Sequence, residues 1–243
     1  KRLPAHRPPA RFGAAMAYDE ARGVAVMFGG VTDHAEEFND TWLWDGNDWT
    51  QVFPTRAPAP RWLHAMVYDT HRQVVLLFGG TLAWKDANTW EWDGSNWNEP
   101  DIAEPSWRYG VALAYDTRRG VSVVFGGDEG YGWDCYADTW QRTDGDWVEA
   151  VRAHHPADRH RTHAAYFPRW RSTVMFSGLA CDGNYLRNDT WFWIGGRWLE
   201  MRREPHPIGG GGVMMYDPVA DGLLLYIGAS RPGVPANELW LLR

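Results

Sequence analysis

The sequence has few features that assign a protein to a cellular compartment. Only two of its 243 residues are cysteines, Cys135 and Cys181, which is too few to indicate an oxidising or a reducing environment. It has no run of about eighteen apolar residues and no charged-then-apolar leader at Lys1, so we expect neither a membrane span nor a targeting segment. The localisation of the protein therefore stays open.

Blocks of like charge are also missing. The formal net charge is -7, and acidic and basic residues are mixed along the chain. Proteins that bind nucleic acids usually gather their basic residues into one patch or stripe. We therefore expect no nucleic-acid partner and no membrane partner, and we expect the protein to be a monomer.

The short motifs of common catalytic sites do not occur. The sequence contains no G-x-S-x-G, no P-loop and no dinucleotide fingerprint. Its nine histidines do not show the spacing of a dependable metal motif. The sequence thus predicts no catalytic residue and no cofactor. A metal site assembled from loops by His64, His160 and a carboxylate such as Asp134 is kept as an alternative.

Aromatic residues, in contrast, are abundant and recur in phase. The chain has 17 tryptophans, far above ordinary usage, and the stretch from Arg61 to Trp97 recurs five times at a step of roughly fifty residues. Three aromatic landmarks keep the same step, as Tyr18, Tyr68, Tyr115, Tyr166 and Tyr216, then Phe28, Phe78, Phe125, Phe176 and Tyr226, then Trp42, Trp90, Trp140, Trp191 and Trp240. A fixed step of this length indicates repeated supersecondary units.

Each repeat predicts four short antiparallel strands. In the first copy, an alternating segment ends at Tyr18-Asp19, a polar turn follows, and an apolar run closes at Gly29-Gly30. A variable loop then leads to Thr41-Trp42 and a tight Asp45-Gly46 turn. The loops after the second and the fourth strands should emerge on one face, and long variable loops on a regular scaffold commonly carry function.

The repeats predict one all-β domain over 1–243, a five-bladed β-propeller with four antiparallel strands per blade. The expected blades cover 11–58, 59–105, 106–156, 157–205 and 206–243. The last copy ends at Arg243 before its fourth strand, and residues 1–5 align with the fourth strand of the first copy. We therefore expect the N-terminal strand to complete the last blade, which would remove exposed sheet edges.

The segments GVAVMFGG (23–30) and NDTWLWDGNDW (39–49), repeated through the chain, resemble the kelch-repeat β-propellers of the galactose oxidase central-domain superfamily. The resemblance covers essentially the whole chain and implies the propeller fold. Kelch propellers serve as protein-binding scaffolds, sugar-acting enzymes and metal-assisted lyases, so the resemblance implies no single function. Five blades depart from the six or seven that are common in this family.

An arginine and a ring recur where the first strand of each blade begins. The four pairs are Arg11-Phe12, Arg61-Trp62, Arg108-Tyr109 and Arg159-His160. They could form a positive, aromatic-lined mouth that binds a carboxylate, a sulfate or an acidic peptide; alternatively, each arginine braces its neighbouring blade. The fifth copy has glycines in their place, and Gly210 predicts a notch that admits a ligand; alternatively, Arg231 or Trp62 fills this space, or the glycines allow close packing of the blades.

Several aromatic side chains in the long loops are not repeat landmarks. Trp84, Tyr131, Trp133 and Tyr185 suit stacking on a sugar or gripping a peptide, and packing between loops is the other interpretation. Cys135 and Cys181 lie in equivalent loops of neighbouring repeats. They could form a disulfide, or they could be two free thiols.

The sequence most favours a binding scaffold without enzymatic activity. We expect its long-loop face to recognise an acidic peptide or protein segment, or a carbohydrate. One alternative is a small-molecule enzyme with a metal or acid-base site made by loops at the mouth of the central channel. A second alternative is a shortened or engineered propeller that has no ligand.

Overall fold

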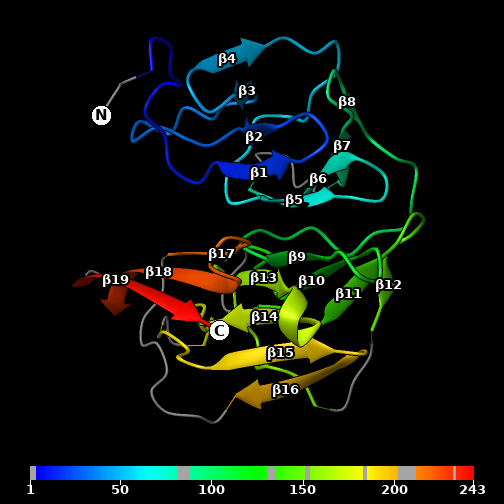
Figure 1. Ribbon diagram of the computed structural model, residues 1–243, viewed down its shortest axis with the longest axis vertical. Helices are drawn as coiled ribbons and strands as arrows, with labels where there is room; N and C mark the ends of the chain where they lie inside the picture. The colour runs from blue at the N-terminus through cyan, green and yellow to red at the C-terminus, as the bar shows by residue number, and fades with distance from the viewer. Residues whose placement is uncertain are drawn as a thin grey trace. The chain divides into compact units, whose positions relative to one another are not determined.

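The structure of the protein is a computed structural model that describes residues 4–81, 88–130, 135–150, 154–182, 185–201, 212–231 and 234–243. Within these residues it has nineteen β-strands and one three-residue 3-10 helix, η1 (Pro168–Trp170). Five antiparallel sheets follow one another along the chain (Figure 1). The protein is an all-β, five-bladed β-propeller, as the repeat predicts.

Each blade begins with the hairpin that the sequence indicates. In the first blade Tyr18 pairs with Ala25 across this hairpin. The buried Asp19, which ends the first strand, accepts hydrogen bonds at Oδ1 from the backbone N–H of Arg22 (3.2 Å) and at Oδ2 from its guanidinium (2.7 Å). The aspartate of the repeated Tyr-Asp pair therefore stabilises the turn, because it accepts hydrogen bonds from N–H groups of the turn that strand pairing does not use.

The chain divides into two compact units, of which the first spans Lys1–Tyr109. It contains two four-stranded blades, ordered β1-β2-β3-β4 and β5-β6-β7-β8. Their bounds are β1 Ala15–Asp19, β2 Val24–Phe28, β3 Thr41–Trp44, β4 Trp49–Val52, β5 Ala65–Asp69, β6 Val74–Phe78, β7 Trp90–Trp92 and β8 Trp97–Asn98.

The second unit spans Gly110–Arg243 and contains three blades. They are ordered β12-β11-β10-β9, β13-β14-β15-β16 and β17-β18-β19. Their bounds are β9 Ala112–Asp116, β10 Val121–Phe125, β11 Thr139–Arg142, β12 Val148–Glu149, β13 His163–Phe167, β14 Ser172–Phe176, β15 Thr190–Ile194, β16 Arg197–Met201, β17 Val213–Asp217, β18 Gly222–Arg231 and β19 Val234–Leu242.

Within each unit, one buried tryptophan fastens a blade to the blade before it. In the first unit the Trp97 indole donates to Thr41 Oγ1 (2.9 Å) and packs edge-on against Phe28 (5.2 Å between ring centroids). In the second unit Trp198 donates to Thr139 Oγ1 at the same 2.9 Å. The repeated tryptophan thus combines apolar burial with a satisfied indole N–H, which a buried Trp requires.

The fifth repeat differs from the expected pattern. Instead of a long irregular loop after its second strand, β18 and β19 continue their pairing up to Arg231 and Val234, with bulges around Ala229. The described sheet has three strands. Residues 1–3 of the expected closing strand lie outside the described residues, and Pro4 and Ala5 are not in a strand. His6 instead binds Asp48 of the first blade through its backbone N–H and its ring Nδ1, each at 2.8 Å.

Candidate functional site

The four arginines expected to line a ligand mouth are all buried. Arg61, Arg108 and Arg159 are 1%, 1% and 0% exposed, and the Arg11 side chain is 5% exposed. Buried guanidinium groups need hydrogen-bonding partners, because desolvating a charge without them is costly. Their partners therefore decide what these side chains do.

Arg159 binds groups of its own blade. Its Nε donates to Ala157 O (2.9 Å), its Nη1 donates to Ser177 O (3.1 Å), and its two Nη atoms reach both carboxylate oxygens of Asp189 (2.5 and 2.7 Å). Burial alone would raise the pKa of Asp189, but the hydrogen bonds and charge of Arg159 outweigh it and hold the pKa below its ordinary value. Arg159 therefore braces the start of its blade.

Arg11 makes the same set of contacts in the first blade. It donates to Gly29 O (2.9 Å) and to both oxygens of Asp40 (2.5 and 2.9 Å). Arg61 donates to Gly79 O (3.0 Å). These contacts agree with the alternative in which each arginine stabilises the scaffold, except that the side chain contacts its own blade and not the neighbouring one. A ligand role for the four arginines stays a prediction.

The double glycines explain how neighbouring blades approach. Gly30 N–H donates to Arg61 O (2.9 Å), so the arginine's backbone binds the preceding blade while its side chain binds its own. Gly29 has φ +65°, and a Cβ there would lie 2.5 Å from Arg61 O. Only glycine fits this position, both by conformation and by space.

The rings beside the first three arginines all belong to the first unit. Phe12 is 53% exposed and meets the partly buried Trp62 edge-on, with ring centroids 5.6 Å apart. Trp62 also packs on the backbone of Gly13, where a Cβ would lie 3.0 Å from the indole. The partly buried Tyr109 lies beside Trp107. In the Phe12–Trp62 pair, the Phe12 ring is thus exposed to solvent and is supported by the Trp62 indole, which packs on the backbone.

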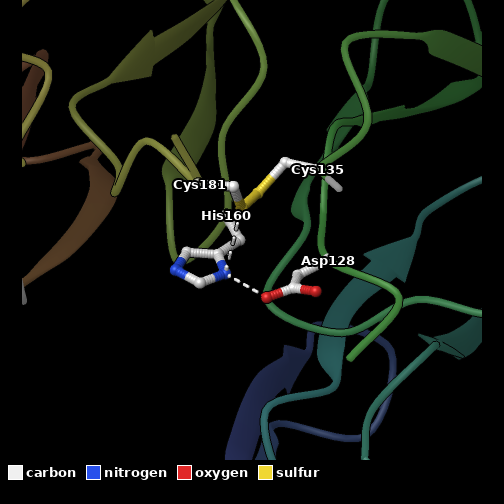
Figure 2. A group of neighbouring side chains, drawn as sticks. All are labelled: Asp128, Cys135, His160 and Cys181. Atoms are coloured by element: carbon white, nitrogen blue, oxygen red, sulfur yellow. Dashed lines mark hydrogen bonds and ion pairs between the residues drawn. A yellow bond between two sulfur atoms is a disulfide. The ribbon is translucent and has the colours of Figure 1, made fainter. Parts of the chain in front are cut away.

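His160, the ring of the fourth pair, is buried in a polar cluster of the second unit. Its Nδ1 forms a hydrogen bond with Asp128 Oδ2 (2.9 Å) and lies 3.9 Å from Cys181 Sγ. The structure joins Cys181 to Cys135 in a disulfide, with the Cα atoms 5.7 Å apart. Figure 2 shows Asp128, the disulfide and the imidazole facing one another. We call these four residues the His160 cluster.

Backbone bridges hold the cluster in place. Asp128 pairs with Cys135 in an isolated antiparallel bridge, and His160 pairs with Leu179 in another, through hydrogen bonds of 3.0 and 2.8 Å. Burial lowers the pKa of His160, the hydrogen bond and charge of Asp128 oppose this, and Arg161 adds to the lowering. At neutral pH the imidazole is therefore uncharged and can act as a ligand.

The other predicted metal residues do not join this cluster. His64 belongs to the first unit, where it is buried against Phe28 (5.7 Å between ring centroids). Burial, followed by the charge of Arg61, lowers its pKa to about 3, so it is a neutral packing residue. Asp134 lies outside the described residues.

Most predicted loop residues also lie outside the described residues, namely Trp84, Tyr131, Trp133 and Gly210. Tyr185 is described and exposed, and the guanidinium of Arg187 lies 5.3 Å from its ring centroid. Arg187 in turn pairs with Asp158 (3.1 Å). Tyr185 therefore remains a candidate for ligand contact.

Sequence reasoning missed Asp128, although the sequence contained a signal. The residue after the glycines is Val31, Thr81 and Leu179 in other repeats, and only the third repeat has a carboxylate there. A charged residue at a position that is otherwise uncharged indicates a local partner. That partner is His160.

Comparisons with known proteins support the fold. No family model matches the sequence, and no curated protein does. The structure is similar to a solved structure of YjhT, with a TM-score of 0.73 and 14% identity over 95% of this chain and 81% of that chain. At this identity the likeness shows the β-propeller fold alone. Within the described residues, no helix has the length and apolar character needed to cross a membrane.

Proposed function

We propose that this protein is a kelch-type propeller of the galactose oxidase superfamily and that it binds a carbohydrate. The Phe12–Trp62 pair supports the proposal. One ring is more than half exposed, the second is held against it, and both follow arginines that are fixed to the backbone. An aromatic surface of this kind stacks against the apolar face of a sugar ring.

The arginine contacts favour a sugar over an acidic peptide. A carboxylate ligand needs guanidinium groups with free donors, whereas Arg11 and Arg159 already make bidentate contacts with Asp40 and Asp189. Displacing either aspartate would leave a partly buried carboxylate without its ion pair. The exposed Phe12 ring, in contrast, is accessible without rearrangement.

A glycan array together with an acidic-peptide array tests this function. We expect glycan binding that falls by about 5- to 30-fold in Phe12→Ala and in Trp62→Ala, because stacking contributes roughly 1–2 kcal/mol per ring. Phe53→Ala is the matched control, since Phe53 is 83% exposed and lies after β4, away from the pair in sequence. Binding to acidic peptides alone, or equal loss in the control, would contradict the proposal.

A further inference from the structure

The His160 cluster contains more than a disulfide. One potential ligand atom from each of Asp128, Cys135, His160 and Cys181 lies within 4.8 Å of the others. Two sulfurs, one imidazole nitrogen and one carboxylate oxygen are a donor set typical of tetrahedral zinc. Asp128, His160 and Cys181 are buried, and Cys135 is partly buried.

The spacing suits a metal ion after small shifts. With zinc–ligand distances of about 2.0–2.3 Å, tetrahedral ligand atoms lie ~3.3–3.8 Å apart. In the cluster, His160 Nδ1 is 2.9 Å from Asp128 Oδ2 and 3.9 Å from Cys181 Sγ. Opening the disulfide would let the two sulfurs separate to a similar distance, while the two backbone bridges keep the loops in place.

We propose that the His160 cluster, once its disulfide is reduced, binds a divalent cation of the zinc class through Cys135, Cys181, His160 and Asp128. The disulfide and the metal are mutually exclusive, because the same two sulfurs form either bond. The oxidised chain holds the two loops by a covalent bond, and the reduced chain holds them by the metal.

The two steps balance when a dithiol is the reductant. One thiolate of the dithiol attacks one of the two protein sulfurs and releases the other, which forms a mixed disulfide. The second thiolate of the dithiol then displaces the remaining protein sulfur, and the reagent leaves as a cyclic disulfide. The reductant supplies two electrons and two protons, which leave Cys135 and Cys181 as thiols. The cation then binds His160 Nδ1, whose proton passes through solvent to Nε2 of the same ring so that the imidazole stays neutral, and both thiols release their protons to solvent. The metal keeps its oxidation state.

The charge of the loaded site is compatible with its surroundings. Two thiolates and the Asp128 carboxylate exceed the charge of a divalent cation by one negative charge. Arg161, adjacent to His160, acts electrostatically on the same ring and partly offsets it. Nearby positive charge also favours the thiolate forms of the cysteines.

The experiment uses the whole chain, reduced with a dithiol and desalted without oxygen, then titrated with Co²⁺ and Zn²⁺. We expect one Co²⁺ per chain with the absorption of a tetrahedral thiolate site, displaced by Zn²⁺, and no such signal from the oxidised chain. His160→Gln and Asp128→Asn should each weaken Zn²⁺ binding by about 10- to 100-fold. His34→Gln is the control, because His34 is exposed and outside the cluster.

Folding is followed by circular dichroism in the same samples. A reduced chain that loses its structure and regains it with Zn²⁺ supports the proposal, because metal binding would then be coupled to folding. The proposal is overturned if the reduced chain is folded but binds no Co²⁺, if it unfolds and Zn²⁺ does not restore it, or if His34→Gln weakens binding as much as His160→Gln.

Discussion

Replacing Arg159 by methionine tests the structural role of the buried arginines. The variant keeps an unbranched side chain of similar length but removes every hydrogen bond of the guanidinium. It leaves Asp189 the bond from the Trp191 indole (2.7 Å) but no cationic partner among the hydrogen bonds described. Breaking a buried ion pair from one side typically costs about 3–5 kcal/mol.

The lower end of that range applies here. The Asp189 side chain is 26% exposed, so water recovers part of its solvation, and we expect a loss of about 3 kcal/mol in the free energy of unfolding at pH 7. For a chain of this size, this corresponds to a fall of roughly 6–12 °C in Tm. Arg197→Met, at an exposed position of the same unit, should change stability by less than about 0.5 kcal/mol.

Urea unfolding at several pH values provides the assay. The pKa of Asp189 is lower in the folded protein than in the unfolded chain, so its contribution is present above its unfolded pKa of about 4 and is lost as pH falls through the folded value. The difference between wild type and Arg159→Met should therefore shrink at strongly acid pH. A variant as stable as Arg197→Met at pH 7 would refute the bracing role.

Three further variants test other contacts. Thr41→Val should cost about 1–3 kcal/mol, because the indole N–H of buried Trp97 loses its acceptor; thermal unfolding measures it, and an unchanged Tm contradicts the contact. The double variant Cys135→Ser/Cys181→Ser should destabilise the oxidised chain by about 4 kcal/mol, given the separation of 46 residues, and equal stability of oxidised wild type and variant would argue against the bond. As pH falls from about 6.5 to 3, the free energy of unfolding should decrease less in His64→Val than in wild type. The reason is that the lowered pKa of His64 makes protonation of His64 favour the unfolded chain; parallel pH profiles of the two proteins would contradict this.

Much of the fold was predictable because the same structural features recur in successive repeats. Each copy has a similar alternation and a tryptophan at the same step, so five blades follow from one. Most copies keep the Tyr-Asp pair, and the first three keep the double glycine, because a turn donor or a close backbone approach requires them. The fifth blade deviates, since the segment around Ala229 continues strand pairing where a loop was expected.

The candidate site was less predictable. Periodicity places Arg11 and Arg159 at the start of a blade but does not say whether a guanidinium faces solvent or the backbone. That depends on Asp40 and Asp189, about thirty residues further on. The pairing of Asp128 with His160 likewise joins two different repeats, and sequence spacing within one repeat could not identify it.

The binding proposal depends most on the Phe12–Trp62 pair. Its most direct test is calorimetric titration of wild type and the double variant Phe12→Ala/Trp62→Ala with a glycan selected on the array. We expect the wild type to bind with a negative heat-capacity change and the folded double variant to lose at least about 30-fold in affinity. A folded double variant that binds the glycan as tightly as wild type would contradict the proposal.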